Sequence, residues 1–267
     1  CGWVALLAFS ILEKSEFETT GFSAIIGGQP AAGDDPLTKA TVGLSRMENG
    51  FLTPFCAGTL ISKNVVLTAQ HCMKNHDISD VKILFGNQVT SDPSKKVYFE
   101  ISKIMRHRYR EIFDDQGVFL TAYNDLAILV LKDFAPSWTS PALVADQNLD
   151  LAINNDFVVV GFGITDESPD IQARGLNFAY VKLFKNLGEL LVVDQRNGHG
   201  VCLGDSGGPA FLKNADGKLI LIGTARGPHN QAISCSKFAE FSNILNQTKF
   251  IIDSIQELGG EMPTFFH

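Results

Sequence analysis

The stretch Gly204-Asp205-Ser206-Gly207-Gly208-Pro209 is the most informative part of this 267-residue chain. It places one serine among glycines, which lack a Cβ and let the backbone turn tightly and approach a reacting group closely. The backbone amides of Gly204 and Ser206 can then point at one spot and stabilise a negatively charged oxygen there. Ser206 is therefore a candidate nucleophile, and the alternative is an ordinary turn serine.

Two distant segments supply the partners that a nucleophilic serine needs. The apolar run 65–69 leads to His71, and Asp125 stands at the start of a second apolar run, 126–131. A histidine can accept the serine proton when a buried carboxylate holds its other ring nitrogen in one tautomer. The chain order His71, Asp125, Ser206 is the order of the chymotrypsin arrangement.

These three segments resemble the trypsin/chymotrypsin family of serine endopeptidases, and the resemblance extends over roughly residues 25–258. Three further stretches are similar to the amino terminus exposed when the family's precursors are cut, to the strand that leads to the family's histidine, and to a turn that carries tryptophan in the family. They are Ile25-Ile26-Gly27-Gly28, Cys56-Ala57-Gly58-Thr59-Leu60-Ile61-Ser62 and Gly161-Phe162-Gly163. The resemblance implies an all-β fold of two six-stranded antiparallel β-barrels, with the active site between them and a C-terminal helix.

The resemblance also implies a role for each candidate residue. Ser206 is the expected nucleophile, His71 the general base and acid, and Asp125 the group that orients the histidine. The amides of Gly204 and Ser206 form the expected oxyanion hole, so the expected activity is hydrolysis of peptide bonds through an acyl-enzyme. Two alternatives are a protease-like binding protein with impaired turnover, and an esterase of another fold, whose serine would usually lie in Gly-x-Ser-x-Gly.

Asp205 is expected to lie buried behind Ser206, where an unpaired carboxylate is costly. The α-amino group of Ile25, freed by a cut after Ala24, is the expected cationic partner. Its insertion would order the oxyanion loop and activate the enzyme. Because the bond to be cut follows alanine, we expect an activating protease that is not trypsin-like.

The resemblance places Gly200, six residues before Ser206, at the base of the primary substrate pocket. An acidic residue that would bind Arg or Lys is therefore absent. Val201, Gly227 and Ser236 are expected to line an open and largely apolar pocket. We expect cleavage after a large apolar or aromatic side chain, and not after Arg or Lys.

Some residues depart from the family pattern. His199, Arg226 and His229 are interpreted either as solvated loop charges or as groups that select an acidic side chain. Gln70 replaces a small residue before the histidine. The segment 223–227 lacks the serine and tryptophan of the family's substrate strand, where that serine helps to hold the triad aspartate, and Thr224 is the candidate to replace its hydroxyl.

The composition agrees with a globular, mostly β protein. Hydrophobic residues make up 45% of the chain and charged residues 19%, and the net charge of −7 argues against nucleic-acid binding. Short apolar runs separated by Gly, Asn, Asp and Pro are typical of barrels or sandwiches. The expected parts are one barrel over about 40–133, a crossover over 134–143, a second barrel over about 143–245 and a helix over about 246–258.

An apolar stripe supports the C-terminal helix, because its members recur at helical spacing: Phe250, Ile251, Ile255 and Leu258. The preceding Asn246-Gln247-Thr248 matches a glycosylation acceptor, or equally a helix N-cap region.

The five cysteines point to an oxidising compartment. The resemblance pairs Cys56 with Cys72 and Cys202 with Cys235, each link contributing about 3 kcal/mol. The alternative is four free thiols in a cytosolic protein. The remaining cysteine, Cys1, is either part of a secretory signal remnant over 1–12 or lipid-modified, and 13–24 is the expected propeptide.

No metal or cofactor is expected, because Glu100, Asp114 and Asp115 form no recognisable metal loop. The stretch Arg110–Tyr123 is long, and either overhangs the active site or is an idle surface insertion. The expected partners are protein or peptide substrates and protein inhibitors. We expect a secreted monomer without a membrane span.

Overall fold

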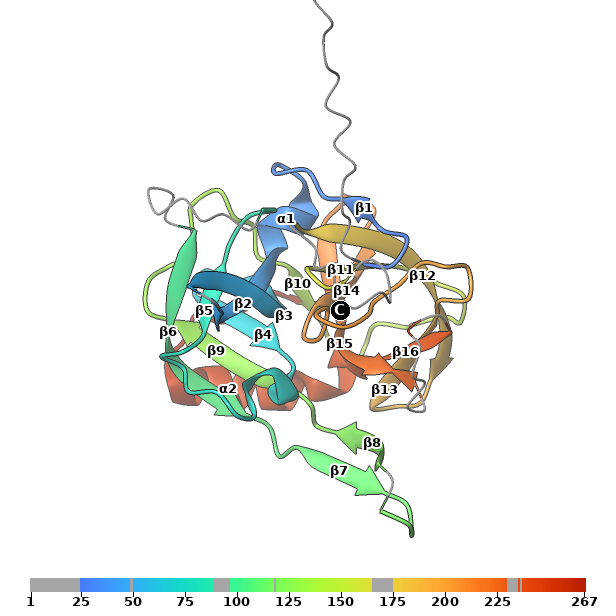
Figure 1. The fold of residues 1–267 in the computed structure, drawn as a ribbon. Helices are drawn as coiled ribbons and strands as arrows, with labels where there is room; N and C mark the ends of the chain where they lie inside the picture. The colour runs from blue at the N-terminus through green and yellow to red at the C-terminus, as the bar shows by residue number, and fades with distance from the viewer. Residues whose placement is uncertain are drawn as a thin grey trace, which may run out of the picture.

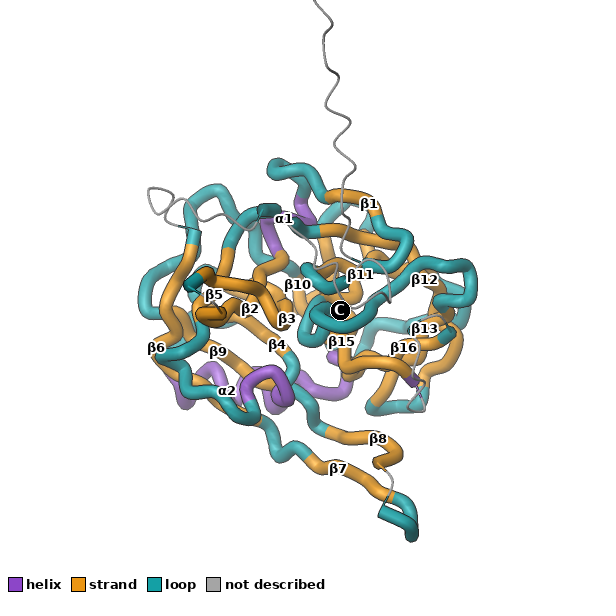
Figure 2. Tube along the Cα trace, viewed as in Figure 1, coloured by secondary structure: helices purple, strands orange, loops and turns teal. Residues whose placement is uncertain are grey.

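The computed structural model describes residues 25–48, 50–88, 97–117, 119–164, 175–229, 235 and 237–267. The expected signal remnant 1–12, the expected propeptide 13–24 and the expected pocket residue Ser236 lie outside these ranges. Strands dominate the described residues and gather into two lobes (Figures 1 and 2).

Six strands of the amino-terminal half form a closed antiparallel barrel in the order β2-β3-β4-β9-β6-β5. They are β2 (Thr41–Glu48), β3 (Phe51–Ser62), β4 (Val65–Thr68), β5 (Lys82–Leu84), β6 (Tyr98–Arg106) and β9 (Ala127–Leu131). The branched and aliphatic residues of these runs fill the barrel, as those of β4 and β9 do with no exposed side chain. The chain therefore brings His71 to the end of a rigid strand.

Six strands of the carboxyl-terminal half form the second ring, in the order β14-β11-β12-β13-β16-β15, which the β14–β15 pairing closes. They are β11 (Asp156–Gly161), β12 (Asn177–Asn186), β13 (Leu190–Asp194), β14 (Pro209–Lys213), β15 (Leu219–Pro228) and β16 (Phe238–Asn243). All six pairings are antiparallel. The predicted fold of two six-stranded antiparallel barrels is confirmed.

Three short strands extend the second barrel in a way that the sequence did not suggest. β10 (Leu143–Ala145) pairs parallel to β15, β17 (Phe265–Phe266) pairs parallel to β10, and β1 (Gln29–Pro30) pairs with β12. These are strands of two or three residues, too short to give an alternating pattern.

Buried side chains from both barrels merge into one cluster, which includes Ala57 and Leu84 of the first barrel and Val160 and Phe211 of the second. Phe162, at the turn expected from the resemblance, belongs to the same cluster. The segment between β9 and β10 crosses from one barrel to the other, as expected. Apolar burial therefore fixes the barrels against each other and positions the segments that carry the candidate site.

Helix α2 (Thr248–Leu258) follows a 3₁₀ turn over Ile244–Gln247 and packs against the first barrel (Figure 1). Its apolar stripe behaves as expected: Ile251, Ile255 and Leu258 are buried, and Phe250 is partly buried. The cap forms earlier than expected, because the Asn243 side chain accepts from Leu245 N at 3.1 Å. A shorter helix, α1 (Pro36–Ala40), begins at the cap residue Asp35.

The long stretch before Asp125 forms a hairpin of β7 (Arg110–Phe113) and β8 (Phe119–Tyr123). It projects from the body of the molecule (Figures 1 and 2). In the described part of the chain, no helix has the length and apolar character needed to cross a membrane.

Candidate active site

His71 and Asp125 meet at the end of the first barrel. His71 lies in the 3₁₀ turn Gln70–Met73 directly after β4, and Asp125 lies just before β9, the neighbour of β4 in the barrel. The ring Nδ1 of His71 lies 2.6 Å from Asp125 Oδ2, and the backbone N of His71 donates to Asp125 Oδ1 at 2.8 Å. This carboxylate fixes the proton on Nδ1 and leaves Nε2 free to accept one.

A strained turn aims Asp125 at the histidine. Asn124 has a φ of 58°, a left-handed conformation that asparagine tolerates better than most residues. Its side chain donates to Arg108 O at 3.1 Å, and its carbonyl accepts from Leu126 N at 3.0 Å. The backbone on both sides of Asp125 is therefore held.

The Asp125 carboxyl is almost fully buried, with a side chain that is 3% exposed. Burial alone would raise the pKa of Asp125, but the hydrogen bonds and charge of His71 and the charge of Arg226 outweigh it, so the pKa is lowered. The carboxylate is thus charged at neutral pH and able to stabilise a protonated imidazole.

Ser206 lies on the turn that enters β14, and contacts with the first barrel anchor it. Its carbonyl oxygen accepts from Ala57 N at 2.8 Å and lies 3.5 Å from Cys72 Sγ, next to His71 in sequence. Among the residues that the structure describes, no hydrogen bond joins the Ser206 hydroxyl to the His71 ring. Such bonds are often long in ligand-free enzymes and tighten when substrate binds.

The backbone amides of Gly204 and Ser206 donate to no acceptor among the described residues. Their neighbours in the turn are engaged: Gly207 N donates to Ala225 O at 2.8 Å, and Gly208 N donates to Asp205 O at 2.9 Å. The turn is therefore held in one shape while both candidate oxyanion donors stay available.

Asp205 is completely buried behind this turn, as expected. Its two oxygens accept from Gly163 N at 2.8 Å and from Cys202 N at 2.9 Å. A Cβ on Gly161 would collide with the Asp205 carboxylate, so the Gly161-Phe162-Gly163 turn needs its glycine to let the acid pack this closely. Burial raises the pKa of Asp205 to about 7 against these two hydrogen bonds.

No cation contacts Asp205 in the described ranges of the chain. Ile25 is buried in the second barrel's apolar cluster, but its nitrogen belongs to the peptide bond with Ala24 in this continuous chain. The following residue, Ile26, exchanges backbone hydrogen bonds with Gly200 at 2.9 and 3.0 Å. The expected amino terminus is thus docked beside the Ser206 loop, with its amine not yet free.

The expected pocket residues lie around a buried glutamine that the sequence did not single out. The Gln195 side chain accepts from Val201 N at 2.8 Å and donates to Val201 O at 3.1 Å and Cys235 O at 2.6 Å. A Cβ on Gly200 would collide with this side chain. Gly227 lies on β15 opposite Glu240. No carboxylate side chain accompanies Gly200 in these contacts.

The segment 223–227 does not behave as expected. It is part of a ten-residue strand, β15, and the Thr224 hydroxyl is buried without a partner in the described part of the chain, so Thr224 does not replace the family's serine. Instead the guanidinium of Arg226 lies 3.8 Å from Asp125 Oδ2 and 2.9 Å from Glu240. Both interpretations of Arg226, a solvated charge and a selector of acidic substrates, are wrong, because the side chain is 7% exposed and its charge is paired.

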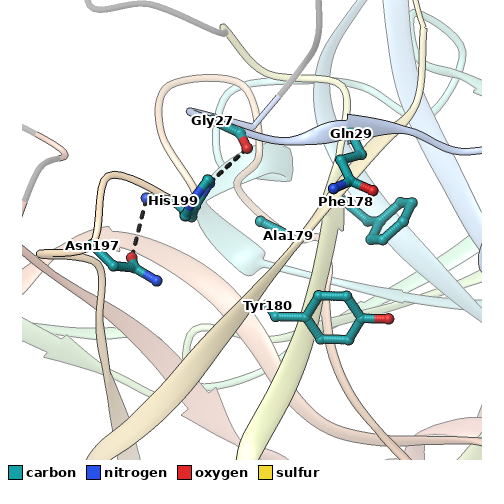
Figure 3. Close-up of a pocket in the computed structure, with 7 residues that line it drawn as sticks. All are labelled: Gly27, Gln29, Phe178, Ala179, Tyr180, Asn197 and His199. Carbon is teal, nitrogen blue, oxygen red and sulfur yellow. Dashed lines mark hydrogen bonds between the residues drawn. The ribbon is translucent and has the colours of Figure 1, made fainter.

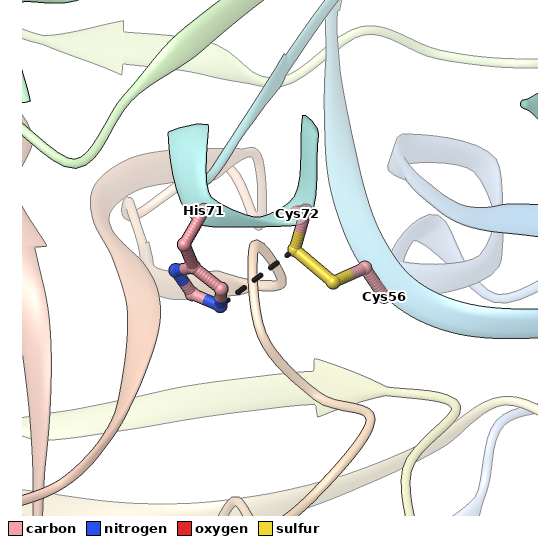
Figure 4. Close-up of side chains that lie close together, drawn as sticks. All are labelled: Cys56, His71 and Cys72. Atoms are coloured by element: carbon pink, nitrogen blue, oxygen red, sulfur yellow. Dashed lines mark hydrogen bonds between the residues drawn. A yellow bond between two sulfur atoms is a disulfide. The ribbon is translucent and has the colours of Figure 1, made fainter. Parts of the chain in front are cut away.

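Both cysteine pairs implied by the resemblance are disulfides in the structure, Cys56–Cys72 and Cys202–Cys235. The first lies beside the histidine, with Cys72 Sγ 3.8 Å from His71 Nε2 (Figure 4). Although these two sulfurs and the ring nitrogen are close enough to resemble a metal site, the sulfurs are bonded to each other and offer no thiolate.

A separate pocket of about 220 Å³ lies beside the 25–28 segment (Figure 3). His199 lines this pocket, and its Nδ1 lies 2.6 Å from Gly27 O. None of the candidate catalytic residues lines it. The assignment of the active site therefore rests on His71, Asp125 and the Ser206 turn.

Comparison with known proteins agrees with this geometry. Three relatives are Serine proteinase stubble of Drosophila melanogaster (27% identity; 74% of this chain and 27% of the relative), Brachyurin of Leptuca pugilator (24%; 78% and 89%) and Venom serine protease 34 of Apis mellifera (30%; 63% and 44%). The chain thus spans about a quarter of the first relative and most of the second. The family model Trypsin matches residues 25–246. With this match across most of its length, the chain belongs to the trypsin family of serine endopeptidases.

Proposed function

We propose that this protein is a secreted serine endopeptidase that hydrolyses peptide bonds through an acyl-enzyme on Ser206. The observation that supports it most is the His71–Asp125 pair, with Nδ1 2.6 Å from the buried carboxylate and Nε2 left without a proton. The two disulfides support an oxidising compartment.

In this mechanism, Ser206 Oγ attacks the carbonyl carbon of the scissile bond while its proton passes to His71 Nε2. The charge that develops on the carbonyl oxygen is stabilised by the amides of Gly204 and Ser206. Asp125 stabilises the protonated ring, which then donates its proton to the leaving amine. Water attacks the acyl-enzyme in the same way, with His71 accepting its proton and returning one to Ser206 Oγ.

Cleavage after Ala24 is proposed to switch the enzyme on. The new α-amino group of Ile25 would carry a positive charge and pair with Asp205, whose buried carboxylate has only backbone donors in the uncut chain. That pairing would fix the Gly204–Ser206 amides in their donating positions. The amino-terminal sequence of active enzyme tests it, since a start other than Ile25 contradicts the switch.

The proposed substrates are peptides with a large apolar or aromatic side chain before the cut bond. Support comes from Gly200, which carries no charge and is backed by the uncharged Gln195. A peptide-library cleavage profile of protein that begins at Ile25 tests this proposal, with Ser206→Ala as the control for contaminating proteases. A clear preference for Lys or Arg would contradict it.

The alternative function is a protease-like binding protein with impaired turnover. It is favoured by one observation, the replacement of the family's substrate-strand serine by the charged network around Arg226. The two functions differ in turnover: the proposed enzyme releases both peptide products repeatedly, whereas the binding protein retains intact peptide.

A further inference from the structure

We propose that Arg226 and Glu240 form a positioning pair for the catalytic carboxylate: Glu240 holds the Arg226 guanidinium beside Asp125 Oδ2, and the pair controls how well Asp125 stabilises protonated His71. This inference rests on the proposed function, because it takes His71 as the general base. Arg226 and Glu240 act through Asp125 and do not touch the reacting atoms.

A bulge in the sheet directs Arg226 toward the triad. The β15–β16 register shifts between Ala225 and Gly227, so Arg226 occupies the irregular position. Bulges of this kind re-aim a side chain and are common beside active sites. Ala225 in turn exchanges backbone hydrogen bonds of 2.8 Å with Gly207 and Gly208. The strand that carries Arg226 is therefore tied directly to the turn that carries Ser206.

The contacts of Arg226 show how it is held. Nε lies 3.8 Å from Asp125 Oδ2, Nη1 lies 2.9 Å from Glu240 Oε2, and Nη2 lies 3.4 Å from Thr121 Oγ1 on β8. The side chains of Arg226 and Glu240 are 7% and 8% exposed. A planar guanidinium suits this arrangement, because it can address several oxygens at fixed angles. The same contacts tie the projecting hairpin to the triad.

Charge explains why the pair needs both members. A lone cation beside Asp125 would weaken its attraction for protonated His71, and a lone buried carboxylate would be costly. With Glu240 ionised, the pair is neutral overall and Asp125 keeps its field at the ring. Removing Arg226 or Glu240 alone should therefore change the basicity of His71 in opposite directions.

Other titratable groups face this cluster from neighbouring elements. His229 Nδ1 lies 2.6 Å from Glu240 Oε1. Tyr109 lies near Asp125, and burial first, then the charges of Asp125 and Glu111, raise its pKa to about 12, so it stays neutral in the working range. Lys74 pairs with Glu111 at 2.8 Å. Because His229 also titrates, the test must follow the His71 ring itself.

The experiment follows the His71 ring resonance by NMR against pH, in chain cut after Ala24, with kcat and KM measured on the same proteins. Arg226→Gln is expected to raise the pKa of His71 by about one unit and Glu240→Gln to lower it by a similar amount. In the double variant the two changes cancel, so the pKa returns near its starting value. Arg46→Gln, which breaks an exposed ion pair with Glu48, is the matched control and leaves it unchanged.

Two further outcomes keep the test decisive if a single variant fails to fold. The double variant leaves no unpaired charge, and Arg226→Lys retains the charge without the planar fork. We expect Arg226→Lys to keep the pKa of His71 while lowering kcat per titrated active site by about tenfold, with KM little changed. Equal pKa values in all folded variants, or single variants that shift it the same way, would overturn the positioning pair. A wild-type protein that hydrolyses no peptide overturns the proposed function instead.

Discussion

Asp205 gives the most quantitative prediction for the uncut chain. Its carboxyl is fully buried, it contacts no cation in the described ranges, and its pKa is raised to about 7 from an ordinary value of 3.8. A raised pKa means that the folded state favours the protonated acid. The stability of the folded chain is therefore unaffected below the unfolded pKa and falls as pH rises from there through about 7, by about 4 kcal/mol in total.

The assay is equilibrium unfolding in denaturant between pH 4 and pH 8. The protein is the uncut chain with Ser206→Ala, which prevents self-cleavage, and the control carries Asp205→Asn in addition. Asparagine does not titrate, so the difference in free energy of unfolding between the two proteins isolates Asp205. We expect the aspartate protein to lose about 4 kcal/mol relative to the control over this range.

Cleavage after Ala24 provides the counterpart. The free amine of Ile25 then supplies the missing positive charge, which lowers the pKa of Asp205 and removes the loss at high pH. A difference between the aspartate protein and its Asp205→Asn control that stays constant with pH in the uncut chain would refute this reasoning, as would the same pH dependence before and after cleavage.

Three other predictions concern the rest of the site. Asp125→Asn should lower kcat by about 10⁴-fold while the protein stays folded, because the histidine loses the tautomer that the carboxylate enforces; steady-state kinetics and circular dichroism check both parts. Gly207→Ala, at a φ of 80°, should cost about 3 kcal/mol or more, since its Cβ would collide with barrel-one atoms, whereas Gly217→Ala, at a φ of 75° in open space, should cost only about 1 kcal/mol; equal losses on denaturant unfolding would contradict the packing argument. Replacing Cys202 and Cys235 together by alanine opens a link across 33 residues and should lower the free energy of unfolding by about 3 kcal/mol, and an unchanged midpoint would count against it.

The barrels could be predicted from the sequence because their strands are short apolar runs between turn-forming residues, as at β4 and β9. His71 and Asp125 end and begin such runs, so pairing the strands brings them together. The two-residue strand β17 has no such pattern, and its pairing with β10 depends on where α2 leaves the chain end.

The network behind Asp125 could not be predicted in the same way. Arg226 follows a bulge, and a single irregular residue changes which side chain faces the triad. Thr224 matched the expected hydroxyl in chemistry but lies at a different register position. The remaining signal was Glu240, a charged residue in the middle of the apolar segment 238–242, which indicates a buried partner of opposite charge.

The central claim is that Ser206 is a nucleophile activated by His71, and covalent labelling tests it most directly. Protein cut after Ala24 is treated with a fluorophosphonate and examined by intact-protein and peptide mass spectrometry. We expect one adduct, located on Ser206, that is absent from Ser206→Ala and forms far more slowly on His71→Ala. A folded protein beginning at Ile25 that takes up no adduct, or an adduct that persists in Ser206→Ala, would contradict the claim.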